Sequence, residues 1–225
     1  MSDFVWESLW KHPKLGTING TERLYDYLKK NPHTNLNEYD TMGHTALTSA
    51  IVGVNHAVAR LLVSDGFDLN TIVSTPVDVN APNESYETPL IVAIHYDSYY
   101  LADLLIKSGA DVLKRVPETD ATAVHEAWGR VYASGGSLFS LDLLELMLAH
   151  CPDYHAPIGS LSDGELSVFG WALKIKNETD FFKHYQEESK KFINKLCQQY
   201  QAEMDQQEIQ RATIPIVSPH KGFRF

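Results

Sequence analysis

Apolar residues recur along this chain with the spacing of paired helices, and one pattern occurs twice. The segments 43–47 and 87–90 each open a short apolar stretch, and a Leu-Leu pair follows each of them, at 61–62 and 104–105. Corresponding positions of the two segments are 43 residues apart. Apolar residues three and four positions apart form one face of an amphipathic helix. The pattern therefore predicts two copies of one helix-turn-helix unit.

The residue types at the repeated positions suit such a unit. Threonine at a helix start caps free backbone N–H groups, and proline is tolerated in the first helical turn. Alanine is small where helices of neighbouring units approach each other, and glycine ends a helix in the left-handed conformation. These positions are Thr45, Thr88, Thr122, Pro89, Ala50, Ala93, Ala127, Ala172, Gly66 and Gly109.

The T-x-L-x-x-A string at 45–50 and 88–93, which reads T-P-L in the second copy, and the L-L-x-x-x-G-x-D string at 61–68 and 104–111 resemble the ankyrin repeat family. The unit of that family, of about 33 residues, is a turn followed by two antiparallel helices. The resemblance implies an all-α, ankyrin-like helix-turn-helix solenoid of about five units with an extended C-terminal helix and tail. Aligning the chain on this period predicts a solenoid at 1–210 and a C-terminal tail at 211–225. The units are expected at 3–37, 38–70, 81–113, 117–154 and 162–200.

Several segments depart from the regular pattern. The 43-residue offset indicates about ten additional residues at 71–80, and a second insertion is expected near 133–137, between the helices of the third full unit. The N-terminal unit is expected to consist of helices at 3–11 and 21–37, and a long amphipathic helix is expected at about 180–210. Where the first full unit has Gly43 in its turn, the later units have Tyr86, Asp120 and Glu165.

Charge and composition narrow the classes of partner. The chain has 225 residues, with 19 Lys and Arg against 29 Asp and Glu, so its formal net charge is −10. Phosphate binding needs clustered basic residues, so nucleic acid is not an expected partner. No apolar run reaches the length of a membrane span, and the N-terminus does not resemble a secretion signal. With two widely spaced cysteines, these features predict a cytoplasmic protein, or one delivered to a host cytosol if it is an effector.

The resemblance also implies where a partner binds, because ankyrin proteins typically use their finger loops and the exposed side of the first helices. Acidic residues recur at the corresponding positions, which favours one or more protein partners of basic character. An ordinary solvated surface is the alternative for each position. The predicted partner-binding residues are Met42, His44, Val52, Glu84, Ser85, Glu87, His95, Tyr96, Glu118, Thr119, Arg130, Asp163 and Lys174.

The insertion at 71–83 and the tail at 211–225 are further candidate surfaces. The insertion has two alternatives, a functional loop or a tolerated surface addition. The tail carries apolar residues between prolines, and it is expected to fold back along the solenoid, to cap its end, to dock into a partner, or to fray.

Patterns for catalysis and metal binding are weak. His125-Glu126 begins like a zinc protease motif, but Gly129 occupies the position of the second histidine. The resemblance implies a structural role for His125. No phosphate loop or dinucleotide fingerprint is present, so we expect no cofactor, no metal and no catalytic residue.

The leading hypothesis is therefore a non-enzymatic protein-protein interaction module that sequesters, inhibits or scaffolds a partner protein. An adaptor, an inhibitor, an immunity protein and an effector all fit this description. One alternative is a small enzyme with a site near the irregular third and fourth units, using His125, Cys151 or His184. Another is a structural subunit that self-associates through its tail.

Overall fold

A Thr or Ser side chain caps the N-terminus of one helix in each of four successive helix pairs. The computed structural model describes residues 18–63, 75–117, 120–161, 164–178 and 182–213. Thr45, Thr88, Thr122 and Ser167 each accept a hydrogen bond from the backbone N–H three residues ahead, at 3.2, 3.3, 3.2 and 3.1 Å. This is the N-cap geometry predicted for the three threonines. The capped helices, here called the inner helices, are α3 (Ala46–Val52), α5 (Pro89–His95), α7 (Ala123–Ala133) and α9 (Val168–Asn177).

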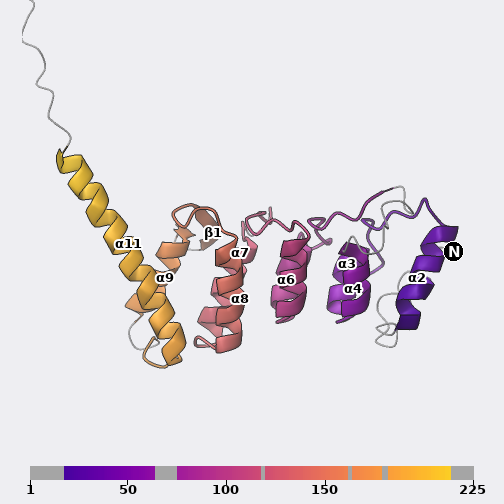
Figure 1. The fold of residues 1–225 in the computed structure, drawn as a ribbon, viewed down its shortest axis with the longest axis horizontal. Coiled ribbons are helices and arrows are strands. Elements are labelled where there is room, and N and C mark those ends of the chain that lie inside the picture. Colours follow the sequence, from indigo (N-terminus) through magenta and orange to yellow (C-terminus); the bar gives the residue numbers. More distant parts are fainter. Residues whose placement is uncertain (1–17, 64–74, 118–119, 162–163, 179–181, 214–225) are drawn as a thin grey trace, which may run out of the picture.

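A second layer of helices runs antiparallel to the first. These outer helices are α2 (Ile18–Lys30), α4 (His56–Val63), α6 (Tyr99–Lys107), α8 (Leu138–Ala149) and α11 (Glu187–Thr213). Each contacts its neighbours in the row, and the chain extends as a stack of helix pairs (Figure 1). The core lies between the two layers, and the alanines predicted at close helix approaches, Ala50, Ala93, Ala127 and Ala172, are all fully buried. The prediction of an all-α, ankyrin-like solenoid is confirmed.

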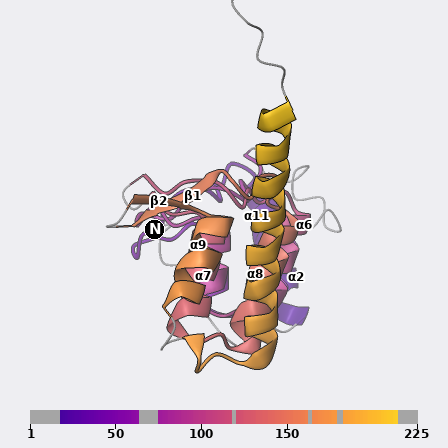
Figure 2. The same ribbon diagram turned by 90° about the vertical axis from the view of Figure 1, so that its left-hand side faces the viewer.

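Finger loops join each outer helix to the next inner helix. We define the first finger as residues 31–44, the second as 75–87, the third as 108–121 and the fourth as 151–167. The fourth finger contains a β-hairpin that the sequence analysis did not predict, in which β1 (Pro157–Leu161) pairs antiparallel with β2 (Gly164–Ser167). The hairpin lies beside the ends of the inner helices and projects past their side (Figure 2). We call the surface formed by the inner helices and this hairpin the inner face.

The finger turns need a residue in the left-handed backbone conformation, and only one of three has glycine there. Gly43 has φ of 77°, and the corresponding Tyr86 and Asp120 have φ of 62° and 53°. The fold thus keeps the turn geometry although the sequence has lost the glycine. Gly109 also has the predicted left-handed conformation, with φ of 90°. Glu165, at the corresponding turn position of the fourth finger, instead lies in β2 and pairs with Ser160. Gly66 lies outside the described residues.

Asparagine side chains bridge successive fingers and reveal the register of the insertion. The side chain of Asn37 donates to Pro76 O at 2.8 Å and accepts from the amide of Asp78 at 2.9 Å. Asn80 makes the same pair of bonds, to Gly109 O at 3.2 Å and from the amide of Asp111 at 2.8 Å. The amide partners lie 41 and 31 positions along the chain. The difference equals the ten additional residues that the sequence indicated.

Three helical segments differ from their expected positions. The helix expected at 21–37 spans Ile18–Lys30, and the one expected at about 180–210 spans Glu187–Thr213. The extra residues expected between the helices near 133–137 mostly lengthen the helices instead, since α7 has 11 residues and α8 has 12, against 7 and 9 in the preceding unit. The helix expected at 3–11 and the tail at 214–225 lie outside the described residues, and the unit boundaries remain predictions.

Candidate protein-binding face

Three large apolar side chains are exposed near the tips of the first two fingers. Tyr39, Met42 and Tyr86 are between 42% and 67% exposed. Glu84 and Ser85, the two residues before Tyr86, are exposed as well. Aromatic residues and Met are enriched where proteins contact each other, so these tips have the composition of a binding surface.

Main-chain contact holds these two tips together. The Glu84 amide donates to Gly43 O at 2.7 Å, and the Glu84 side chain lies directly over Gly43. A hollow of about 720 Å³ adjoins the first finger, and its lining includes Tyr27, His33, Tyr39 and Asp40. The exposed tips therefore sit on a fixed support beside a recess.

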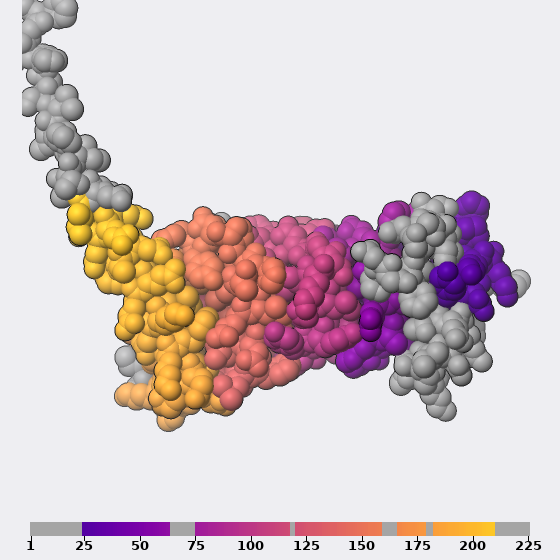
Figure 3. Space-filling view, viewed as in Figure 1, coloured from indigo at the N-terminus to yellow at the C-terminus, as the bar shows by residue number. Residues whose placement is uncertain are grey.

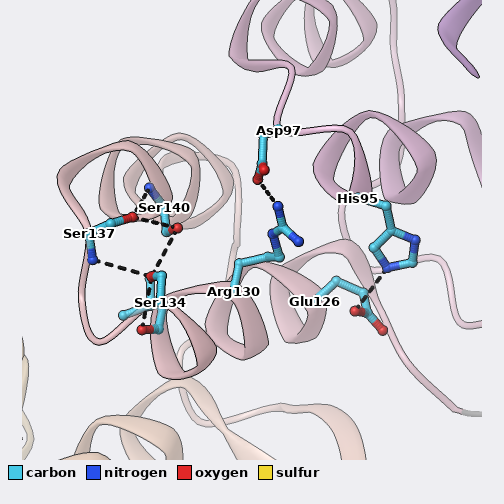
Figure 4. Close-up of polar contacts among 8 residues, drawn as sticks. His95, Asp97, Glu126, Arg130, Ser134, Ser137 and Ser140 are labelled. Atoms are coloured by element: carbon cyan, nitrogen blue, oxygen red, sulfur yellow. Dashed lines mark hydrogen bonds and ion pairs between the residues drawn. The ribbon is translucent and has the colours of Figure 1, made fainter. Parts of the chain in front are cut away.

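A histidine of the second full unit lies between two carboxylates, one of which belongs to the third full unit. Figure 4 shows its contact with that one, Glu126. In α5, His95 places Nε2 at 3.2 Å from Glu126 Oε2 of α7, and Nδ1 at 3.1 Å from Glu87 Oε1. Asn83 donates from its side chain to Glu87 Oε2 at 2.8 Å and so fixes that carboxylate. A neutral imidazole has only one N–H, and only the protonated ring donates to both carboxylates.

The pKa values follow from this geometry. The hydrogen bond to Glu126 is the main cause that raises the pKa of His95 above 6.5, against the opposing effect of burial. The same bond is the main cause that lowers the pKa of Glu126. Much of the negative charge expected on this face is therefore balanced within the protein.

Two further cations on the inner helices also have partners. Arg130 of α7 forms an ion pair with Asp97, which lies in the turn after α5 (Figure 4). Lys174 of α9 lies over the ring of Trp171, 5.8 Å from its centroid. Trp171 in turn stacks on Trp128 of α7, with ring centroids 6.5 Å apart. These contacts tie neighbouring units together across the face.

The structure places the predicted partner-binding residues in three groups. Met42, Glu84 and Ser85 are exposed at the finger tips, and Tyr96 is exposed at the end of α5. Glu87, His95, Arg130 and Lys174 take part in the contacts described above, and His44 and Val52 are partly buried. Glu118, Thr119 and Asp163 have no described side chain.

Sequence reasoning missed Glu126, Asp97, Tyr39 and Tyr86 as surface residues of interest. Glu126 was considered only as part of a zinc motif, although its place one turn into an inner helix puts it on the same face as Arg130, four residues later. Tyr86 was noticed only as a replacement for glycine. A tyrosine in a finger turn is itself a signal of a binding surface. The left-handed backbone conformation there has an energetic cost, and burial of the ring does not fully offset it.

The residues named for the enzymatic alternative show no shared site. The His125 ring contacts that of Trp171, with ring centroids 5.5 Å apart, and burial lowers the pKa of His125. The Cys151 thiol is buried, donates to Asp153 O at 3.5 Å, and has its pKa raised by burial, which disfavours the nucleophilic thiolate. His184 lies in the turn before α11. Within the described ranges, no cluster of His, Cys, Asp and Glu has the arrangement of a metal site.

Comparison with known proteins gives one family match. Residues 85–115, which include α5 and α6, match the family model of the ankyrin repeat. No curated protein matches the chain. One similar solved structure is the ankyrin repeat domain of Bcl-3, a member of the IkappaB protein family, at 22% identity and a TM-score of 0.47. The similarity covers 61% of this chain and 51% of that one, so it spans about half of the Bcl-3 domain. Among the helices of the described residues, none has the length and apolarity to cross a membrane.

Proposed function

Because the chain has an ankyrin repeat at 85–115 between helix pairs of the same construction, we propose that it binds another protein through its inner face and fingers. Ankyrin repeats are protein-protein interaction modules, and solenoids of this kind offer extended binding surfaces. The proposed role is non-enzymatic: the chain sequesters, inhibits or scaffolds its partner by occupying part of that partner's surface.

The exposed cluster of Tyr39, Met42 and Tyr86 is the observation that carries this proposal. An aromatic side chain at a left-handed turn position costs conformational energy, about 1–2 kcal/mol for a non-glycine residue. Tyr86 has this conformation, with φ of 62°, and its side chain is 42% exposed. Burial of the ring in the fold therefore offsets only part of the conformational cost. Burial of these three side chains against a partner would supply the benefit that the isolated chain lacks.

Charge supports a basic rather than an acidic partner, although less strongly than the sequence suggests. His95 and Arg130 balance Glu87, Glu126 and Asp97 on the inner helices. Glu84 stays exposed between Tyr86 and the first finger, and the chain as a whole carries −10. We expect the electrostatic contribution to come from Glu84 and from the overall charge, and to appear mainly in the association rate.

Site-specific photo-crosslinking tests the proposal. A photo-reactive amino acid replaces Met42 at the finger tip, and in the matched control it replaces Ile209, which is 64% exposed on α11 against 67% for Met42. We expect one protein from the native cell extract to crosslink from position 42 and not from 209, and to be lost when Tyr39→Ser and Tyr86→Ser are added. Equal crosslinking from both positions, or no effect of the tyrosine substitutions, would remove the fingers from the binding site.

A further inference from the structure

A second exposed apolar surface lies at the opposite edge of the solenoid from the fingers. The turns between inner and outer helices line this edge, and the outer helices α6 and α8 begin there (Figure 1). The first two residues of α6 are Tyr99 and Tyr100, and those of α8 are Leu138 and Phe139; all four are between 41% and 48% exposed. We call these four residues the apolar strip.

The strip is a repeated feature of the two units. Ser98 and Ser137 are the N-caps of α6 and α8, so Tyr99 corresponds to Leu138 and Tyr100 to Phe139. The next residue of each helix, Leu101 or Ser140, is buried. Because α6 packs against α8, the four exposed side chains belong to adjacent helix ends. Figure 3 shows the segments that contain these two helices side by side. Single exposed apolar residues are common, but such a repeated group marks an interaction surface.

An acidic row runs beside the strip. Asp103 of α6 and Asp142 of α8 each lie four residues after the first residue of their helix, and Glu145 continues the same face of α8. Asp103 is bound by Lys107 at 2.7 Å. Helix α8 contains no Lys or Arg, and within the described part of the chain no ion pair is found for Asp142 or Glu145. The two exposed carboxylates of α8 therefore give the surface beside the strip a net negative charge.

Basic residues lie on the neighbouring elements: Arg60 of α4 occupies the position that corresponds to Asp103, and Lys183 is exposed in the turn before α11. The negative charge beside the strip is therefore confined to α8, at Asp142 and Glu145. On α11, the corresponding first residues are Glu187 and Glu188, with Lys190 and Lys191 one turn later, so that helix end is locally balanced. Arg130 is occupied by Asp97. A partner for this edge thus needs an apolar side to cover the strip and a basic side to face Asp142 and Glu145.

We propose that the strip binds a basic amphipathic helix of another protein, lying across the N-terminal ends of α6 and α8. A second copy of this chain fits less well, because a strip-to-strip contact would bring the two acidic rows together in a protein of charge −10. The same argument disfavours an anionic membrane surface. This site is separate from the fingers, so one chain can hold two segments at once.

Fluorescence anisotropy with a defined probe tests this assignment. The probe is a labelled Leu/Lys amphipathic peptide of about five helical turns, and its partner peptide has every Lys replaced by Glu. We compare the wild type with a strip variant (Tyr100→Ser and Phe139→Ser), a charge variant (Asp142→Asn and Glu145→Gln) and a finger variant (Met42→Ser and Tyr86→Ser). All of the substituted side chains are exposed, and circular dichroism verifies that the helices remain.

We expect the Leu/Lys probe to bind the wild type and the finger variant equally, and the strip variant about tenfold more weakly. The charge variant should bind about threefold more weakly and with less dependence on salt. The Leu/Glu peptide should not bind. Equal binding to the strip variant and the wild type, or a loss confined to the finger variant, would overturn the proposal. A wild-type dimer in sedimentation that the strip variant cannot form, or strip-dependent binding to lipid vesicles, would replace the proposed occupant and overturn it as well.

Discussion

The amide of Glu84 donates a 2.7 Å hydrogen bond to the carbonyl of Gly43 and joins two successive fingers by their main chains. This contact requires that position 43 has no side chain. A Cβ there would come within 2.5 Å of Glu84 Oε2 and 2.7 Å of Glu84 Cβ. The first finger therefore depends on glycine for two reasons, its left-handed φ of 77° and the space that Glu84 occupies.

Gly43→Ala is predicted to destabilise the fold more than Gly109→Ala. Gly109 also has a left-handed φ, of 90°, but a Cβ there meets nothing within 4 Å. Gly109→Ala should therefore lower the free energy of unfolding by only the conformational cost, about 1 kcal/mol. Gly43→Ala should cost at least about 1 kcal/mol more, because Glu84 must move. Urea unfolding of both variants measures the difference, and equal losses would show that the Gly43–Glu84 contact does not constrain the fingers.

Tyr86→Gly is predicted to separate stability from binding. Glycine adopts the left-handed conformation of position 86, where φ is 62°, without steric cost. After the higher entropy of glycine in the unfolded chain is subtracted, the free energy of unfolding should rise by about 0.5 kcal/mol. Crosslinking to the partner from position 42 should decrease at the same time. A variant that is less stable, or that binds as well as the wild type, would indicate that Tyr86 has a structural role instead.

The ion pairs of His95 predict a pH-dependent stability. Because the pKa of His95 is raised in the folded state, its contribution is fully present below the ordinary value of 6.5 and is lost as the pH rises through the raised value. The pKa of Glu126 is lowered, so the contribution of that carboxylate is lost only in acid. A change in the free energy of unfolding near neutral pH therefore reports on the protonation of His95.

Thermal unfolding of the wild type and His95→Gln across this range tests the point. Below about pH 6 the wild type should be more stable, by a few tenths to about 1 kcal/mol for such partly exposed pairs, and above about pH 9 the difference should vanish. His184→Gln is the control, because no ion pair of His184 is seen among the described side chains. A His95→Gln effect that does not change with pH would contradict the assignment of charge to this ring.

Repetition explains why the sequence predicted the architecture. Each capping threonine and each buried alanine occurs in several units, so one misread position changes little. The turn residues show the limit of this reasoning. Loss of glycine at Tyr86 and Asp120 suggested uncertain turn geometry, but both residues have positive φ. The turns are closed by bonds from the Tyr86 amide to Asn83 O at 2.9 Å and from the Asp120 amide to Val116 O at 2.7 Å. The preference of a single residue is a local property, and the structure around the turn outweighs it here.

The fourth finger and the inner face were less predictable for different reasons. Ser162-Asp163-Gly164 is a run of residues that favour turns, and its Asp-Gly pair is a hairpin signal that the helical repeat pattern obscured. The pairing of His95 with Glu87 and Glu126 joins two units, and no spacing within one unit reveals it.

The strip at Tyr99, Tyr100, Leu138 and Phe139 looks like core in the sequence. Only the exposure of the first helical residues distinguishes it.

Helix α11 rests on the turn between α7 and α8 at one of two adjacent glycines, which gives a matched test. Gly135 and Gly136 are both left-handed, with φ of 63° and 73°. A Cβ on Gly135 meets nothing within 4 Å, whereas one on Gly136 would come within 2.6 Å of the Tyr185 ring and 3.0 Å of Ser189 Cβ. The Ser189 hydroxyl also donates to Gly136 O at 2.7 Å. Gly136 is thus where the start of α11 rests on the turn before α8.

Gly136→Ala is therefore predicted to loosen α11, and Gly135→Ala is not. Gly135→Ala should lower the free energy of unfolding by about 1 kcal/mol from its conformation alone. Gly136→Ala should lower it by about 2–4 kcal/mol, since Tyr185 and Ser189 are buried and cannot move aside without losing their contacts. Hydrogen exchange resolves where the loss occurs: protection should fall in α11 and α9 for Gly136→Ala while α3 and α5 keep theirs. Uniform loss of protection along the chain would mean that α11 unfolds only together with the whole solenoid.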